Sequence, residues 1–121
     1  MAQQLTRMGI KTYHTGGLLN SYGNMTYGSI AEDSVRRFHL DVAFFDCSSL
    51  SDDGLFGGVK EYGVSLLRVV LEHSKVRVLA CHPDIIGVLA PYVITSIRDI
   101  DAVICDTELP LPLQNMLGKN R

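Results

Sequence analysis

The sequence has little positive charge. It contains 11 Lys and Arg against 13 Asp and Glu, a formal net charge of -2 at pH 7, and Arg36-Arg37 is its only adjacent basic pair. A nucleic-acid-binding surface needs clustered cations that displace counterions from phosphates. We therefore expect no nucleic-acid binding by this segment on its own.

Long apolar runs and paired cysteines are also lacking. No run approaches the roughly 20 residues of a membrane-spanning helix, and Met1–Gln4 lacks the basic and apolar regions of a signal peptide. Cys47, Cys81 and Cys105 are odd in number and form no Cys-x-x-Cys pair, which favours free thiols in a reducing compartment. We expect a cytoplasmic protein with no membrane partner.

Short apolar segments indicate β-strands. Leu40–Phe45 has five apolar residues in six, which indicates a strand buried on both faces, as in parallel sheets. Val76–Ala80 is predicted as a second buried strand and Ala102–Cys105 as a further one. Ile10–His14 alternates apolar and polar residues and is also predicted as a strand. The segment Leu18–Tyr27, rich in Asn, Ser and Gly, reads as a loop.

Helical periodicity separates these strands. Residues 1–8 read as the end of a helix with Gly9 as its C-cap, and Ser29 with Glu32 fits the capping box of a second helix. That helix carries an apolar stripe of Ile30, Ala31, Ser34, Val35 and Phe38.

The longest helix is predicted from about Val59 to His73. Its inward stripe consists of Val59, Tyr62, Gly63, Leu66, Leu67 and Val70. Ile85–Thr95 is broken by Gly and Pro and reads as a short helical turn and a short extended piece. A last short helix follows Pro110 and Pro112.

This alternation predicts one α/β domain, Rossmann-like, with an open, mostly parallel sheet and helices on both faces. At 121 residues the domain is small for a complete doubly wound sheet. Ligands of such sheets bind at the carboxyl ends of the strands. The residues expected there that carry chemistry are His14, Asp46, Cys47, Cys81, His82, Cys105 and Asp106.

Thiols and imidazoles on one edge can form a metal site. Cysteines that end buried strands are, however, often small hydrophobic residues, and paired ligand spacing is absent, so we expect no metal and no cofactor. A nucleophilic Cys47 or Cys81, activated by His14 or His82, has no stronger support.

Two further features are weak alone. Thr15-Gly16-Gly17 can cradle an anion with backbone amides, although such a pair of glycines is more often a turn. Glu61 can act as an acid or base, or can merely complement the dipole of its helix.

The order of several motifs is more specific than any one of them. The motifs are Tyr13–Leu18, Tyr27–Ala31, Arg37–Phe44, Asp53–Leu55, Glu61 with Val64, Leu79–Ala80 and Ile97–Asp106. In this order they resemble the C-terminal effector-sensing domain of the DeoR family of bacterial sugar-catabolism repressors. The resemblance spans nearly the whole chain.

The resemblance implies a fold related to ribose-5-phosphate isomerase and a phosphorylated sugar as the effector that relieves repression. It implies a homo-oligomer and no catalytic activity. It also implies that DNA is bound only through a winged helix-turn-helix domain absent from this chain, and that the chain begins inside the sensor and is a partial domain.

The chain departs from the family pattern toward less positive charge. Asp46 and Ser49 stand where the family usually has glycines, and Cys81-His82-Pro83-Asp84 replaces its Asp-Ser-Ser-Lys loop. Ser65 replaces a second lysine. We therefore expect an altered or lost preference for phosphosugars.

The resemblance and the sheet edge together give an expected effector site. Its residues are Thr15, Gly16, Gly17, Asp46, Cys47, Ser48, Ser49, Glu61, Cys81, His82, Asp84 and Asp106. Two alternatives remain open: a sugar-phosphate isomerase in which Glu61 and Asp46 move a proton, and an oligomerisation domain that binds no ligand.

Overall fold

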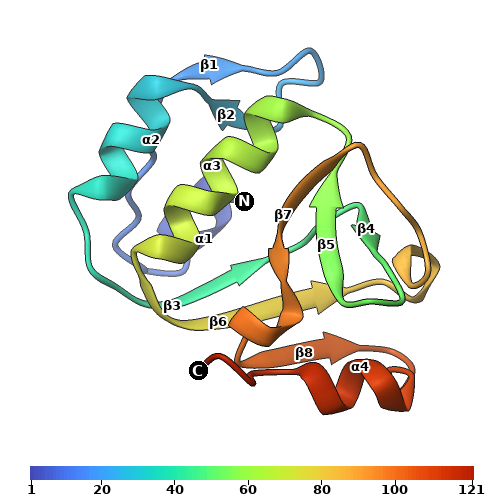
Figure 1. Cartoon of the computed structure of the whole chain (residues 1–121). Helices are drawn as coiled ribbons and strands as arrows, with labels where there is room; N and C mark the ends of the chain where they lie inside the picture. Colours follow the sequence, from blue (N-terminus) through green and yellow to red (C-terminus); the bar gives the residue numbers. More distant parts are fainter.

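The computed structural model describes residues 1–121 and has the α/β architecture that the sequence predicts. Strands β3 (Leu40–Phe45), β6 (Ser74–Cys81) and β8 (Ala102–Cys105) form a parallel sheet in the order β3-β6-β8 (Figure 1). All three strands lie where the apolar runs predicted them. Because they are parallel, their carboxyl ends meet at one edge of the sheet.

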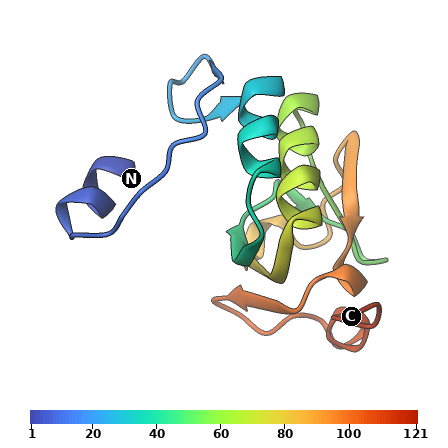
Figure 2. The same cartoon turned by 90° about the vertical axis from the view of Figure 1, so that its left-hand side faces the viewer.

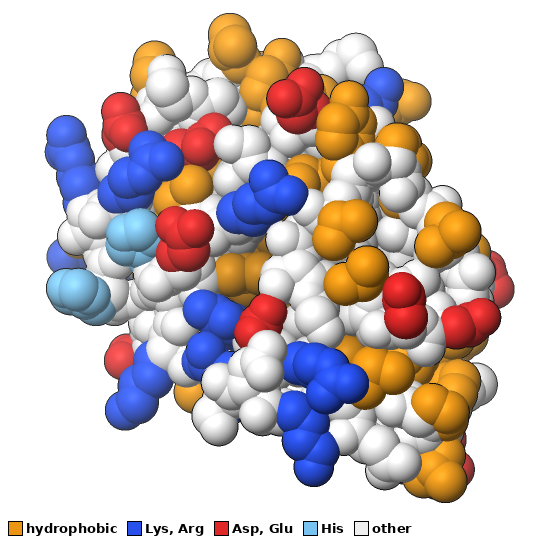
Figure 3. All heavy atoms as spheres, in the orientation of Figure 1, with side chains coloured by type: hydrophobic (Ala, Val, Ile, Leu, Met, Phe, Trp, Pro, Cys, Tyr) orange, Lys and Arg blue, Asp and Glu red, His pale blue; other side chains and the backbone are white.

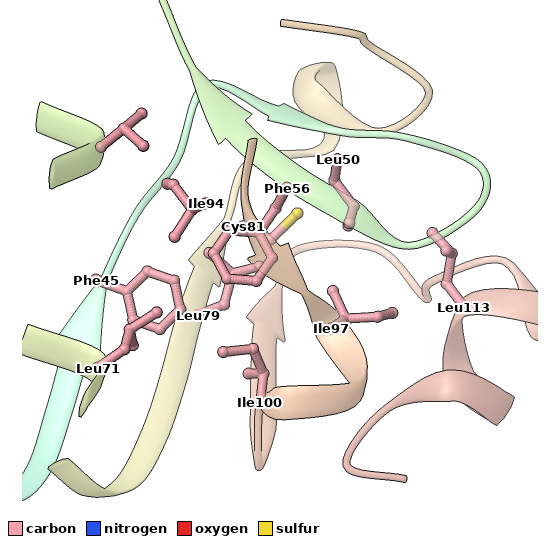
Figure 4. Close-up of a cluster of buried hydrophobic side chains, with 11 residues drawn as sticks. Phe45, Leu50, Phe56, Leu71, Leu79, Cys81, Ile94, Ile97, Ile100 and Leu113 are labelled. Carbon is pink, nitrogen blue, oxygen red and sulfur yellow. The ribbon is translucent and has the colours of Figure 1, made fainter. Parts of the chain in front are cut away.

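Helix α3 (Glu61–Glu72) organises the core. It contacts β3 and β6 of the parallel sheet and also two strands of a second sheet, described below. The side chains beneath it form one cluster, in which Phe56, Leu79 and Ile100 are fully buried (Figure 4). The core therefore lies where the two sheets meet under α3.

The second sheet was not predicted. Strands β4 (Ser49–Leu50), β5 (Leu55–Gly58) and β7 (Tyr92–Ser96) pair antiparallel in the order β4-β5-β7. The extended piece expected within Ile85–Thr95 is confirmed as β7, which pairs with β5, whereas the sequence predicts no strand at β4 or β5. The guanidinium of Arg68 on α3 donates hydrogen bonds to two carbonyl oxygens of β7.

A two-stranded hairpin occupies the predicted loop. Strands β1 (Leu18–Leu19) and β2 (Thr26–Tyr27) pair antiparallel, so the loop prediction for these residues is wrong at both ends. Tyr27 stacks on Tyr62 with ring centroids 4.1 Å apart. This contact places the hairpin against the first turn of α3.

The remaining helices lie close to their predicted positions. Helix α1 spans Ala2–Arg7 and α2 spans Ser29–Arg36. Helix α4 spans Leu111–Met116 and so includes Pro112 rather than following it. The short helical turn expected within Ile85–Thr95 lies earlier, as a 3₁₀ turn at Pro83–Ile85. Gly9 has φ +81°, as expected for a residue that follows a helix C-terminus.

The capping box of α2 does not form. Gly28 is the N-cap residue, and no side chain caps the helix. The carboxylate of Glu32 instead accepts a hydrogen bond of 3.1 Å from Ser65 Oγ and lies 3.6 Å from Arg36. The capping box predicts that the Glu32 carboxylate accepts a hydrogen bond from the helix backbone. In the structure this carboxylate is bonded to Ser65 of α3 instead.

The strand predicted for Ile10–His14 is also absent. This segment has no strand assignment and no ladder partner. His14 and Leu40 line one pocket, and Leu40 begins β3, so His14 lies away from the carboxyl edge where the sequence placed it. An alternating pattern forms a strand only where a neighbouring strand is available.

Strand β3 is not buried on both faces. It lies at the edge of the sheet, with Ala43 and Phe45 buried toward α3 but Val42 and Phe44 45% and 70% exposed on the other face. Ile104 of β8 is also exposed. Figure 2 shows α1 and the segment after it standing apart from the body rather than on this face.

The stripe predicted to face inward on α3 is misplaced as well. The buried residues of α3 are Val64, Val69 and Leu71, whereas all six residues of the predicted stripe line an open groove. Val59 precedes the helix and is 57% exposed. Helical periodicity predicts which side of a helix is apolar, but it does not predict which element packs on that side.

Gly57 gives a test of the joint between β5 and β7. A Cβ atom at this position would lie 1.9 Å from the carbonyl oxygen of Tyr92, so Gly57→Ala forces the two strands apart. We expect a loss of roughly 1–3 kcal/mol in the free energy of unfolding, measured by urea denaturation.

Gly63→Ala is the matched control. Gly63 lies inside α3, where a Cβ atom would meet only Met25 Cε at 3.7 Å, and alanine favours the helix by roughly 0.5–1 kcal/mol. Equal stability of the two variants would contradict this packing.

Candidate functional site

A groove of about 350 Å³ lies between the end of β3 and the start of α3. Its walls are mostly apolar and come from Phe45 at the end of β3 and from Leu66, Leu67 and Val70 of α3. The groove is large enough for a small molecule, and small-molecule sites combine apolar walls with a few polar groups.

The polar groups are gathered at the mouth of this groove. Asp46 and Ser48 follow β3, and Lys60 precedes α3. All three side chains are exposed. A carboxylate and a hydroxyl can hydrogen-bond the hydroxyl groups of a ligand, and the ammonium of Lys60 can pair with an anionic group. The mouth therefore suits a polar ligand with or without a negative charge.

Lys60 is the functional candidate that sequence reasoning missed. The sequence places it next to Glu61, but the structure makes Lys60 line the groove and leaves Glu61 exposed outside that lining. The available signal was a lysine two residues after Gly57-Gly58, at the start of the predicted helix. Asp46, the other carboxylate of the isomerase alternative, lines the groove, whereas Glu61 does not.

Ser49 belongs to the packing beneath the mouth, whereas Cys47 is half-buried and lines the groove. Ser49 is 3% exposed and pairs with Gly57 in the β4–β5 ladder. Cys47 Sγ lies 3.4 Å from the carbonyl oxygen of Ser49. Burial raises the pKa of the Cys47 thiol to about 11.

The ends of β6 and β8 bring the other two thiols beside Cys47. Cys81 and Cys105 are paired in register. Burial, together with the nearby Cys105 and Cys47 thiols, raises the pKa of Cys81 to about 12. The predicted meeting of the three cysteines is confirmed, but no group of three His, Cys, Asp or Glu side chains in the chain has an arrangement that can hold a metal ion.

The loops after β6 and β8 are more exposed. The backbone N–H of Asp84 donates to His82 Nδ1 at 3.2 Å, and the Asp84 carboxylate lies 3.4 Å from the same atom. His82, Asp84 and Asp106 are exposed and lie outside the lining of the groove. They form the outer rim of the carboxyl edge.

Thr15, Gly16 and Gly17 lie apart from this edge. The Thr15 and Thr26 hydroxyls are 2.9 Å apart, and Ser34 Oγ donates to the carbonyl oxygen of Thr15 at 2.8 Å. A Cβ atom on Gly17 would lie 2.6 Å from the Tyr27 carbonyl oxygen. These glycines therefore allow the chain to pack closely against β2 and the start of α2.

The charge at the carboxyl edge is mainly negative. Asp46, Asp84 and Asp106 follow the three parallel strands, and Lys60 is the cation at the mouth of the groove. Ser65 does not supply a further polar group to the groove, because its hydroxyl is bonded to Glu32 of α2. Figure 3 shows the apolar side chains that surround the exposed face of α3 and the second sheet.

Comparison with known proteins identifies one family. The family of the DeoR C-terminal sensor domain matches residues 1–107. The L-fucose operon activator of Haemophilus influenzae is 24% identical over 110 residues, 91% of this chain and 44% of that protein. The transcriptional repressor GlcR of Bacillus subtilis is 26% identical over 98 residues, 81% of this chain and 38% of that protein.

A third relative is the uncharacterised HTH-type regulator YgbI of Escherichia coli. It is 29% identical over 106 residues, 88% of this chain and 41% of that protein. The chain thus spans about two fifths of the length of these relatives. None of its helices has the length and apolar character needed to cross a membrane.

The raised thiol pKa values predict slow cysteine chemistry. At pH 8, a pKa of about 11 in place of 9.0 lowers the thiolate fraction of Cys47 by about 100-fold. We expect iodoacetamide to label Cys47 and Cys81 of the folded chain far more slowly than a free thiol, as measured for each cysteine by mass spectrometry. Labelling of the urea-unfolded chain is the control, and fast labelling of folded Cys47 would contradict the burial described here.

Proposed function

Because the chain belongs to the DeoR C-terminal sensor domain family, we propose that it senses a small molecule, and that a sugar or sugar phosphate binds in the groove between β3 and α3. The observation that carries this proposal is the polar mouth of an otherwise apolar groove, formed by Asp46, Ser48 and Lys60.

The chemistry of the mouth suits a polyol. An ionised carboxylate accepts two hydrogen bonds from neighbouring hydroxyl groups, and a serine hydroxyl donates or accepts one. Lys60 adds a cation for a phosphate, although it is a compact point charge that lacks the bidentate geometry of arginine. Asp46 opposes an anion, so the balance between Asp46 and Lys60 determines the preference for phosphate.

The name of one relative supports a sugar ligand. It is named as the activator of an L-fucose operon, and another relative is named as a transcriptional repressor. In a regulator of either kind, an effector changes DNA affinity by binding two arrangements of the protein unequally. DNA contact would belong to a part of the regulator outside these 121 residues.

The proposed domain is not catalytic. Relatives with printed functions are transcriptional regulators. Glu61, the expected proton carrier of an isomerase, lies outside the lining of the groove that contains Asp46. The acid–base pair that the isomerase alternative names, Glu61 with Asp46, therefore does not line one groove.

Thermal unfolding in the presence of free sugars and their phosphates tests ligand binding. At a concentration of 100 Kd a ligand stabilises the folded chain by about 2.7 kcal/mol, which corresponds to a rise in Tm of roughly 10 °C for a domain of this size. We expect at least one member of the panel to have this effect. A panel of aldoses, ketoses and their phosphates that leaves Tm unchanged would refute sugar sensing.

Two substitutions assign the roles at the mouth. Lys60→Met should remove most of the stabilisation by a sugar phosphate and little of that by the free sugar, whereas Asp46→Asn should weaken the free sugar and spare the phosphate. Lys119→Met, which removes an exposed lysine far along the chain from the groove, is the matched control. Equal effects of Lys60→Met and Lys119→Met would exclude Lys60 from the site.

A further inference from the structure

Three cysteines that are distant in the sequence meet at the carboxyl edge of the parallel sheet. Cys81 ends β6 and Cys105 ends β8, and the two are paired in register. The pairing of Phe45 with Leu79 aligns β3 with β6. Cys47 follows Phe45 by two residues and therefore lies near the level of Cys81. All three cysteines are free thiols.

Cys81 and Cys105 are the pair of thiols placed to form a covalent bond. Residues paired in register on neighbouring parallel strands direct their side chains to the same face, and these two thiols are within hydrogen-bonding distance of each other. Neighbouring strands lie about 4.7–4.9 Å apart, and the two Cα atoms of a disulfide usually lie about 4.4–6.8 Å apart. A disulfide between this pair therefore needs no change of strand register.

Cys47 is less well placed to bond with Cys81. It lies beyond the end of β3 and has no ladder partner on β6. Its Sγ atom is 3.4 Å from the carbonyl oxygen of Ser49, and its side chain lines the groove. A bridge from Cys47 to Cys81 would therefore require the connection between β3 and β4 to move.

The two paired thiols differ in their access to solvent. Cys81 is 6% exposed and belongs to the buried cluster (Figure 4). Cys105 is half-buried and is followed by the exposed residues Asp106 and Thr107. The Thr107 hydroxyl lies 3.9 Å from Cys105 Sγ and can donate a hydrogen bond that favours the thiolate. Cys105 is therefore the thiol of the pair that a dissolved oxidant meets first.

We propose that Cys81 and Cys105 are a site of reversible oxidation, at which a low-molecular-weight disulfide converts the two thiols to an intramolecular disulfide. The Cys105 thiolate attacks one sulfur of the oxidant, which forms a mixed disulfide and displaces the first thiolate. Cys81 then loses its proton to solvent and attacks the Cys105 sulfur, which displaces the second thiolate. The two cysteines lose two protons and two electrons, and the oxidant leaves as two thiols.

The geometry of the pair makes the bridge easy to reduce. The Cβ atoms of a disulfide lie about 3.8 Å apart, which is closer than the spacing of about 4.7–4.9 Å between neighbouring strands. Closing the bridge therefore draws the ends of β6 and β8 together. Strain of this kind makes a disulfide more reducible, as in disulfides that form and open reversibly.

The oxidation site lies beside the candidate effector groove but does not depend on it. Cys47 lines the groove, and its thiol lies near Cys81. His82 and Asp106 directly follow the two bridged residues, so the bridge fixes the spacing of the two loops at this edge. The oxidation can therefore be tested without any effector.

Intact mass in glutathione buffers tests the oxidation. Oxidised glutathione should lower the mass of the folded chain by about 2 Da, the mass of two hydrogens, and an excess of reduced glutathione should restore it. Alkylation of the remaining thiol in urea, followed by peptide mapping, should place the bridge at Cys81 and Cys105 and the label at Cys47. An unchanged mass, a bridge to Cys47 or a stable glutathione adduct would overturn the proposal.

Three variants separate the roles of the thiols, and circular dichroism verifies that each is folded. Cys81→Ala should accumulate one glutathione on Cys105, because the second thiol is missing. Cys105→Ser should form no bridge and, since Cys81 is buried, should take up glutathione far more slowly. Cys47→Ala is the matched control and should form the bridge as the unchanged chain does. A bridge in Cys105→Ser, or its loss in Cys47→Ala, would show that a different pair of thiols is oxidised.

Discussion

The packing of α3 on two sheets at once is the constraint on which the rest of the structure depends. Its buried side chains contact the parallel sheet, and Arg68 binds carbonyl oxygens of the antiparallel one. The core lies at the junction, where Leu79 and Phe56 from the two sheets are fully buried. The beginning of the same helix forms one wall of the groove, so any shift of α3 changes the core and the candidate site together.

Elements with a strong local pattern could be predicted from the sequence. β3, β6 and β8 are short apolar runs, and α2 and α3 have clear helical periodicity. The antiparallel sheet could not be predicted in the same way, because β4 has only two residues and β5 contains two glycines and pairs with β7, which is distant in sequence. Ile10–His14 shows the reverse case, in which a strand pattern has no neighbour.

The candidate site was predicted only in part for the same reason. Asp46 and Ser48 follow a predictable strand, and the structure places both at the groove. The place of Lys60 at the groove could not be predicted, because it depends on the orientation of α3. Contacts with β5 and β7 set this orientation. Thr15, Gly16 and Gly17 were expected at the sheet edge but lie beside α2. They were placed at the edge because Ile10–His14 was predicted to be a strand of the sheet, and that strand is absent.

The acidic rim of the carboxyl edge has a consequence for the speed of binding. Asp46, Asp84 and Asp106 create a negative potential through which a ligand must diffuse. An anionic ligand is repelled during its approach even if Lys60 holds it once bound, and dissolved salt screens that repulsion over about 10 Å at 0.1 M. Its association would therefore become faster as ionic strength rises, while a neutral sugar would enter at the same rate throughout.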